Sequence, residues 1–366
     1  MSLWIPGLAG VALLVLLVYR SESLRVLLDI AAAGADSRLK QRSILPAHQA
    51  IEYGVNGQLI AADLYRPAET IRAAIVLVPG AAEAGKDDPR LVAFAQTLAR
   101  TGFLVLVPQI EQIQQFRLRP DNSLDIVEAF QVLQRQLPVQ TTVSTGLGAF
   151  SYAAGPAILA ALNETIRSDV DFVLAIGGYY DIRQVMAFIS TGRYQRDDRM
   201  VALTPHPFTR LLFILSHMDL LAPRDKALIH SYIERYRHRP EELDLEQVSA
   251  ELGVEGRSLL ALMQNTDLSR VEDLYMSLPQ RVRENLDGLD MAQQDLSRLH
   301  ARLLLIHGRD DNLIPYTQSL QLAKHVPAAD VYVVGGLQHV NVRPSLFAIM
   351  NLWRAVRRLL ALRSHH

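Results

Sequence analysis

Three residues that together could activate a nucleophile occupy comparable places in this sequence. Ser151, Asp311 and His339 each follow an apolar run that predicts a buried strand. A serine hydroxyl is a poor nucleophile until a histidine takes its proton, and a carboxylate fixes the histidine tautomer and stabilises the imidazolium. If the three strands are parallel, their carboxyl ends meet at one edge of a sheet. The spacing therefore predicts a Ser-His-Asp triad at that edge.

Each residue also has a simpler interpretation. Ser151 lies in the turn GAFSYAAG (148–155), where it could cap the following helix. Asp310 and Asp311 could be ordinary turn residues after a strand. A single loop histidine such as His339 is usually solvated. All three residue types coming at strand ends in this order favours catalysis over three separate coincidences.

The stretch Gly80–Asp87 (GAAEAGKD), after the first buried run, offers a different chemistry. It is one residue short of the phosphate-binding pattern G-x-x-x-x-G-K-[ST]. Asp87 stands where that pattern needs a hydroxyl for magnesium, and Asp88-Pro89 delays the helix whose N-terminus should face the phosphates. Glu83 adds further negative charge. We therefore expect no nucleotide at this loop.

Apolar runs separated by helical segments predict a mostly parallel, doubly wound sheet covered on both faces. A hairpin signal at Asn56-Gly57 precedes it. The expected strands are Gln49–Tyr53, Gln58–Tyr65, Ala74–Val78, Phe103–Val107, Thr142–Phe150, Phe172–Ile176, Leu303–Ile306 and Val331–Val334. Between Asp181 and His300 the charged, helically periodic sequence shows no convincing strand, which predicts an inserted helical segment. Its apolar stretch Phe208–Leu215 is interpreted as an internal packing face.

With these elements in order, the sequence resembles the α/β-hydrolase family, of the serine esterase, lipase and dienelactone-hydrolase-like kind. The chain order Ser…Asp…His is the order of that family. The turn around Ser151 is similar to G-x-S-x-G, with alanine at both glycine positions. His307–Pro315 resembles the pattern H-G-x-x-D-x-x-x-P, whose acid corresponds to Asp311. The opening hairpin Asp63–Pro67 is also similar, and the likeness covers about Gln49–Gly178 and Ala301–Leu362.

The resemblance implies an α/β-hydrolase fold with a core of residues 47–180 and 301–363, a helical lid or cap of residues 181–300, and a connector of residues 23–46. It implies a serine hydrolase of the carboxylesterase or lipase type, cleaving an ester, or a thioester or amide, through an acyl-enzyme. Neither a cofactor nor a metal is expected. Pro79 stands where many members have histidine.

The resemblance also implies the roles of individual residues. Ser151 would be the nucleophile, His339 the general base and Asp311 the orienting acid, with Asp181 as the alternative acid. The backbone N–H groups of Ala81 and Tyr152 would hold the oxyanion, and Gly80 would permit the close approach of its loop. A catalytically inactive scaffold protein with the same fold is the alternative function.

Composition and the N-terminus limit the partners. The 366 residues include 37 basic and 38 acidic residues and no cysteine, which argues against nucleic-acid binding and excludes thiolate chemistry. Leu3–Tyr19 is a charge-free stretch of 17 residues. It predicts a transmembrane anchor within residues 1–22, followed by basic residues that place the remainder on the cytoplasmic side. We expect a small or lipid-like ester substrate reached near the bilayer.

Overall fold

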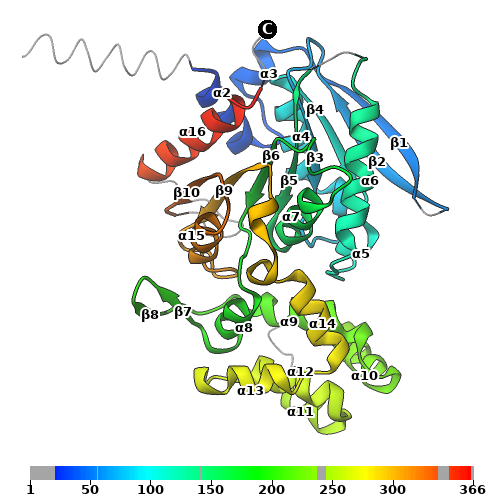
Figure 1. Cartoon of the computed structure of the whole chain (residues 1–366), viewed down its shortest axis with the longest axis vertical. Coiled ribbons are helices and arrows are strands. Elements are labelled where there is room, and N and C mark those ends of the chain that lie inside the picture. The colour runs from blue at the N-terminus through cyan, green and yellow to red at the C-terminus, as the bar shows by residue number, and fades with distance from the viewer. Residues whose placement is uncertain (1–20, 56, 140–141, 237–244, 337–345, 364–366) are drawn as a thin grey trace, which may run out of the picture.

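An eight-stranded sheet forms the centre of the molecule (Figure 1). The computed structural model describes residues 21–55, 57–139, 142–236, 245–336 and 346–363. The strands of the sheet are β1 (Ala47–Val55), β2 (Gln58–Arg66), β3 (Ala73–Val78), β4 (Phe103–Pro108), β5 (Ser144–Phe150), β6 (Phe172–Ile176), β9 (Arg302–Gly308) and β10 (Ala329–Val334). They lie in the order β1-β2-β4-β3-β5-β6-β9-β10. All eight predicted strands are present.

Most of the sheet is parallel. Strands β4, β3, β5, β6, β9 and β10 pair in parallel, whereas β2 pairs antiparallel with β1 and β4. Strands β3 and β4 are buried at every residue, as expected for parallel strands that carry helices on both faces. The prediction of a mostly parallel α/β fold with an opening hairpin is confirmed.

Helices cover both faces of this sheet. Outside the segment between β6 and β9 they are α2 (Glu22–Ala32), α3 (Arg38–Arg42), α4 (Pro89–Arg100), α5 (Glu111–Gln114), α6 (Asn122–Arg135), α7 (Ala154–Leu162), α15 (Thr317–Lys324) and α16 (Leu346–Leu360), with the 3-10 turns η1 (Gly85–Asp87) and η2 (Ser151–Ala153). Side chains of α2, α4 and α16 form one hydrophobic core, and those of α6 and α7 belong to the other. Alternate residues of β3 enter opposite cores, Ile75 one and Val76 the other.

The strand order reverses at β3, which lies between β4 and β5. The chain leaves β3 toward β4 on one side and later reaches β5 on the other side. The loops that follow β3 and β5 therefore diverge and leave a crevice at the carboxyl ends of the two strands, which is where open α/β sheets bind ligands. Gly80 and Ser151 both lie at this point.

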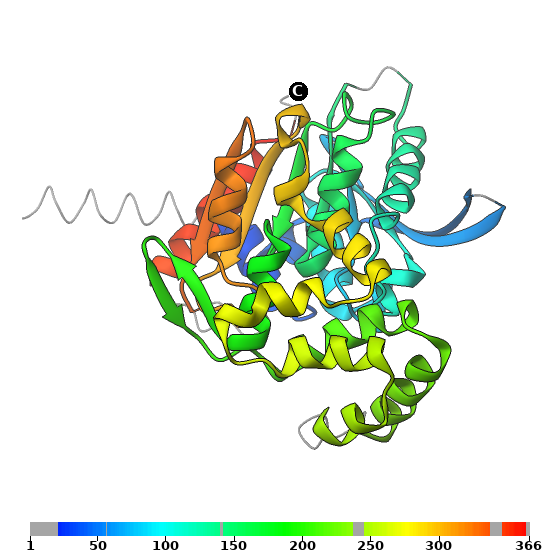
Figure 2. The ribbon, with the colours of Figure 1, turned by 60° about the horizontal axis from the view of Figure 1, so that its bottom comes forward.

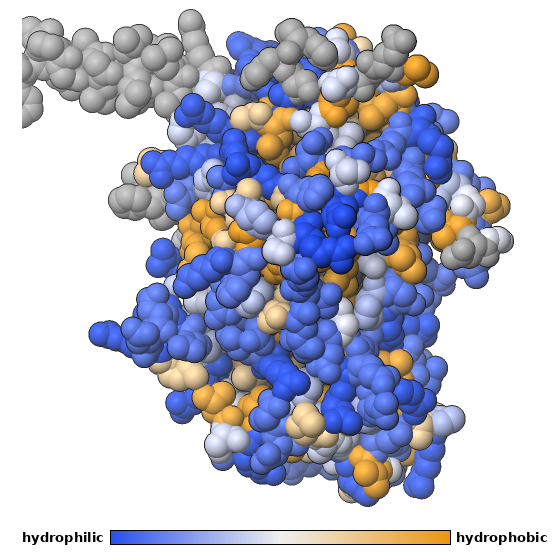
Figure 3. All heavy atoms as spheres, in the orientation of Figure 1, coloured by the Kyte–Doolittle hydropathy of each residue, from blue (hydrophilic) through white to orange (hydrophobic). Residues whose placement is uncertain are grey.

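The segment between β6 and β9 forms a layer of helices below the sheet in Figure 1, seen from another side in Figure 2. Its elements are α8 (Ile182–Thr191), α9 (Pro207–His217), α10 (Pro223–Tyr236), α11 (Leu245–Glu251), α12 (Val254–Gln264), α13 (Val271–Met276), α14 (Gln280–Leu289), the strands β7 (Arg193–Arg196) and β8 (Arg199–Ala202), and the turns η3 (Met218–Leu220), η5 (Leu268–Arg270), η6 (Met291–Gln293) and η7 (Leu296–Arg298). On the face shown in Figure 3, hydrophilic residues cover most of this layer. The β7–β8 hairpin was not predicted, because its two strands are only four residues each and lie largely exposed, so neither forms a buried apolar run.

Residues 23–46, expected as a connector, contain most of α2 and all of α3, and these helices pack on the sheet domain. Asp29 on α2 is fully buried and accepts a 2.6 Å hydrogen bond from the Thr97 hydroxyl of α4. The Ser37 hydroxyl also donates to this carboxylate. At the other end of the chain, the Arg363 guanidinium makes two 2.7 Å contacts with the Glu22 carboxylate. The two ends of the described chain are thereby tied together beside α16.

Within the described ranges, no helix is both long enough and apolar enough to cross a membrane. A spanning helix needs about 20 apolar residues. The longest described helix, α16, has 15 residues and carries Arg354, Arg357 and Arg358. The prediction of a single-pass N-terminal membrane anchor with a cytoplasm-facing domain is therefore wrong. The stretch Leu3–Tyr19 on which it relied lies outside the described residues.

Candidate active site

Ser151 occupies a strained turn between β5 and α7. Its φ angle is +56°, in the left-handed region that residues with a Cβ atom rarely adopt. The residue at the N-cap of η2 is Phe150 and that of α7 is Ala153, and neither makes a side-chain capping bond. Ser151 is therefore not the cap of the following helix, which removes the simpler interpretation of this serine. A strained residue at a strand end is typical of functional sites.

Two glycines lie close to neighbouring residues around this turn. A Cβ atom on Gly80 would lie 3.4 Å from the Phe150 carbonyl oxygen, so the loop after β3 passes directly beside the residue before the serine. A Cβ atom on Gly148 would lie 2.6 Å from Leu77. The positions two residues either side of Ser151 hold the fully buried Ala149 and Ala153, where small residues were expected.

Ser151 opens on a cleft of about 670 Å³ at the crevice between β3 and β5. The loop after β3 supplies one wall, including Gly80 and Ala81, and α4 supplies Leu91 and Phe94. Helix α9 of the inserted segment supplies Phe208 and Leu212. The stretch Phe208–Leu215, interpreted from sequence as a packing face, is thus divided: Phe213 and Ile214 are buried in the core, while two other residues face the cleft. The interpretation as a packing face therefore accounts for only part of this stretch.

Asp311 lies in a buried loop after β9, with its side chain nearly inaccessible to solvent. Its Oδ1 accepts hydrogen bonds from the N–H groups of Leu313 at 2.8 Å and Ile314 at 3.0 Å. Its neighbours Asn312 and Leu313 line the cleft. The Asp311 charge adds to burial in raising the pKa of the Tyr152 phenol, so this carboxylate is close to the residue that follows Ser151.

His307 organises the loop that carries Asp311. Its ring is fully buried, with Nε2 2.9 Å from the Ile314 carbonyl oxygen and 3.5 Å from Asp311 Oδ2, and Nδ1 2.7 Å from the Ser319 hydroxyl. An N–H on Nε2 donates to the carbonyl, which leaves Nδ1 to accept from the serine. This histidine therefore fixes the loop on both sides.

The other predicted residues have different surroundings. Asp310 is exposed and accepts a 2.9 Å hydrogen bond from the Gly336 N–H after β10. Asp181, the alternative acid, is the N-cap of α8 and accepts from the Gln184 N–H at 3.0 Å. His339 lies outside the described residues.

The resemblance to a phosphate loop has a structural explanation in ion pairs. The Lys86 ammonium lies 3.1 Å from Asp63 Oδ2 and 2.7 Å from Asp87 Oδ1. Helix α4 begins at Pro89, and its first turn is capped by Asp88, which accepts from the Arg90 N–H at 2.9 Å. A carboxylate thus already occupies the helix N-terminus where a phosphate would bind.

Solved structures supply the comparison with known proteins, since no family model and no curated protein sequence matches the chain. An acylaminoacyl peptidase from Pyrococcus horikoshii matches with a TM-score of 0.50 at 13% identity, over 89% of this chain and 43% of the peptidase. An acylaminoacyl peptidase in complex with Z-Gly-Gly-Phe-chloromethyl ketone matches with a TM-score of 0.54 at 11% identity, over 91% and 44%.

A third structure matches over nearly its whole length. A candidate hydrolase from Legionella pneumophila has a TM-score of 0.56 at 12% identity, over 93% of this chain and 95% of its own. This chain spans less than half the length of the two peptidases. At such identities the likeness concerns architecture, and it agrees with the sheet order and the crevice described above: the chain has the α/β-hydrolase fold.

Proposed function

We propose that this protein is a serine hydrolase that cleaves carboxylic esters through an acyl-enzyme intermediate. The observation that carries the proposal is Ser151, held at a φ of +56° beside the loop of Gly80 and open to a cleft of about 670 Å³. A helix cap or a surface serine needs neither the strain nor the cleft. The volume falls in the range of small-molecule sites.

The chemistry assigns one role to each residue. The Ser151 oxygen attacks the ester carbonyl carbon while His339 takes its proton, and the carbonyl π electrons move to oxygen. The backbone N–H groups of Ala81 and Tyr152 stabilise that oxyanion. Collapse expels the alcohol, which receives the proton from His339. Water then repeats the sequence on the acyl-enzyme and releases the acid, while Asp311 keeps the histidine oriented.

The walls of the cleft favour an uncharged substrate. Leu91, Phe94 and Phe208 give it an apolar and aromatic lining. A guanidinium in this lining, that of Arg90, makes contacts of 3.0 and 2.7 Å with the Asp88 carboxylate. Its charge is thus compensated within the protein. Helix α9 closes one side, so we assign the inserted segment the role of a lid.

A fluorophosphonate probe tests the nucleophile directly. The folded wild-type protein should be labelled, and Ser151→Ala should abolish labelling at an unchanged melting temperature. Ser231→Ala, an exposed serine on α10, is the matched control and should be labelled like the wild type. His339→Ala and Asp311→Asn should slow labelling by orders of magnitude. Labelling that persists in Ser151→Ala would remove this nucleophile.

A catalytically inactive scaffold is the second candidate function. It predicts no labelling of the wild-type protein and no hydrolysis of p-nitrophenyl acetate above the rate of Ser151→Ala. Parallel assays with a matched acetyl amide decide between esterase and amidase activity.

A further inference from the structure

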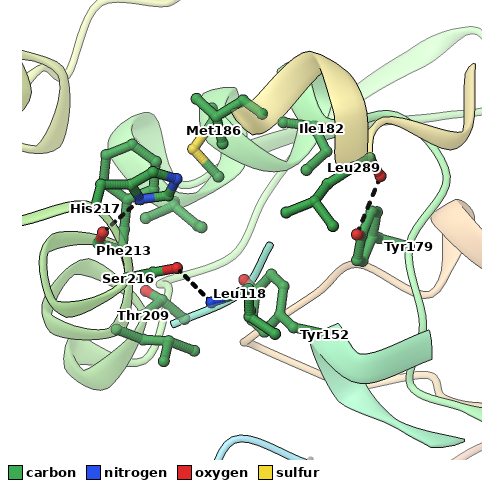
Figure 4. Close-up of a pocket in the computed structure, with 13 residues that line it drawn as sticks. Leu118, Tyr152, Tyr179, Ile182, Met186, Thr209, Phe213, Ser216, His217 and Leu289 are labelled. Atoms are coloured by element: carbon green, nitrogen blue, oxygen red, sulfur yellow. Dashed lines mark hydrogen bonds between the residues drawn. The ribbon is translucent and has the colours of Figure 1, made fainter. Parts of the chain in front are cut away.

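A second, smaller pocket lies on the other side of the residue pair Ser151-Tyr152 (Figure 4). Ser151 lines the cleft, whereas its neighbour Tyr152 lines this pocket. The remaining wall comes mainly from α8, α9 and α14 of the inserted segment, so the pocket lies where that segment meets the sheet domain. Its volume is about 40 Å³, room for a short alkyl group or a few water molecules.

Leu212 lies between the two spaces and lines both of them. Its side chain is almost wholly buried. A leucine side chain moves between rotamers without disturbing the helix backbone. The cleft and the pocket therefore share this side chain as a common wall, and a change of its rotamer would join them beside the nucleophile.

The pocket lining is mostly apolar, and the Tyr152 phenol is a polar group in it that has no partner. Tyr152 is 8% exposed, and its hydroxyl has no hydrogen-bond partner among the described residues. Figure 4 shows this hydroxyl directed toward the middle of the pocket. A buried hydroxyl without a partner costs about 1–3 kcal/mol, and a ligand that accepts a hydrogen bond recovers that cost.

The other polar groups around the pocket are already engaged. The Tyr179 hydroxyl donates to the Leu289 carbonyl oxygen at 3.1 Å, and the Ser216 hydroxyl accepts from the Leu118 N–H at 3.2 Å. His217 Nδ1 lies 2.8 Å from the Phe213 carbonyl oxygen. Burial lowers the pKa of His217 to about 4, so its ring is neutral at pH 7. Among the described residues that line the pocket, Tyr152 is thus the one whose polar group makes no hydrogen bond at all, and none of these residues carries a charge.

We propose that this pocket receives the acyl end of the substrate, and that the acyl group is short and uncharged and carries an oxygen acceptor for the Tyr152 hydroxyl. The inference rests on the proposed function and specifies its substrate. Tyr152 then acts twice: its backbone N–H holds the oxyanion, and its side chain selects the acyl group. Longer chains are excluded by the small volume and by Leu212.

Matched ester pairs test the selection. p-Nitrophenyl 4-oxopentanoate carries the acceptor that p-nitrophenyl pentanoate lacks. In the wild-type protein kcat/KM should be higher for the oxo ester, and Tyr152→Phe should reduce that preference by about three- to tenfold. Met186→Phe, which fills the pocket from α8, should lower kcat/KM for both esters relative to the acetate. Leu212→Ala should extend activity to the octanoate, whereas the neighbouring control Leu211→Ala, which lines neither space, should not.

A binding experiment keeps the inference testable without catalysis. Methyl 4-oxopentanoate should raise the melting temperature of the inactive Ser151→Ala protein, more than methyl pentanoate does, and adding Met186→Phe should remove the effect. If the ester binds but the wild-type protein does not hydrolyse it, the proposed function is wrong, while the pocket is still the binding site of the acyl group. Hydrolysis with chain selectivity unchanged by Tyr152→Phe and Met186→Phe would overturn this inference alone. If Met186→Phe only raises the melting temperature, the pocket is a packing void and the inference is wrong.

Discussion

The Tyr179 hydroxyl fills the space beside Gly155 that a Cβ atom would need. A Cβ on this glycine would lie 2.0 Å from Tyr179 Oη and 2.6 Å from the adjacent ring carbon. Tyr179 itself is buried and hydrogen-bonded to α14. The helix that follows Ser151 is thus seated on a tyrosine that also contacts the inserted segment.

Gly155→Ala should therefore destabilise the protein by about 2 kcal/mol, because the new methyl group displaces the tyrosine from its hydrogen bond. Urea denaturation measures the change. Gly34→Ala is the matched control, since a Cβ there meets nothing within 4 Å. An equally stable Gly155→Ala variant would mean that Tyr179 moves aside freely.

Two replacements of Ser151 separate strain from chemistry. Ser151→Ala keeps the Cβ atom at a φ of +56°, whereas Ser151→Gly relieves it. Both should lose fluorophosphonate labelling, and the glycine variant should be more stable than the alanine variant by about 1 kcal/mol. Chemical denaturation of the two variants gives this difference. Equal stability would show that the turn is not strained.

Lys86 should prove structural. Lys86→Ala leaves the Asp63 carboxylate, only 4% exposed, without its ammonium partner, and should cost about 2 kcal/mol of stability. Asp87→Asn, which alters the exposed partner of the same lysine, is the control and should change stability by less than about 0.5 kcal/mol. ATP should not shift the melting temperature of the wild type. An ATP-dependent shift abolished by Lys86→Ala would restore the phosphate-loop hypothesis.

The buried His217 makes stability depend on pH. Its pKa is about 4 in the folded protein, since burial disfavours the imidazolium, and about 6.5 in an unfolded chain. The unfolded state binds the proton first as the pH falls. The free energy of unfolding is therefore not reduced by His217 above pH 6.5. It falls by about 3 kcal/mol as the pH drops from 6.5 to about 4.

Urea denaturation between pH 7 and pH 4.5 checks this effect. His217→Gln should lose less stability over that range than the wild type does. His230→Gln, an exposed histidine on α10, should follow the wild type. Parallel curves for His217→Gln and the wild type would contradict the assignment.

Local sequence signals predicted the sheet because most of its parallel strands are short apolar runs, and because the turn residues Asn56-Gly57 marked the opening hairpin. The parallel arrangement of the strands in turn predicted a site at their carboxyl ends. The close contact between Gly155 and the Tyr179 side chain could not be predicted, because it joins two segments that no local sequence pattern brings together. Serines at positions 21 and 37 are N-caps of α2 and α3, a signal that could have identified helices in the expected connector.

The candidate site, like the fold, could be predicted from the sequence only in part. The sequence placed Ser151 and Asp311 at the ends of predicted strands, where the structure also has them. That the two residues act together with His339 stays a prediction. The second pocket was not readable at all, because its walls come from Tyr152 and from three helices of the inserted segment that no sequence pattern brings together.

The ion pair between Glu22 and Arg363 makes the chain suitable for circular permutation. Because residues 21 and 363 are held close together beside α16, a short flexible linker between them would close the described chain into a ring. New termini could then be opened in the exposed turn at Asp197 and Asp198 between β7 and β8. Such a circular permutant keeps every strand of the central sheet in register and should fold.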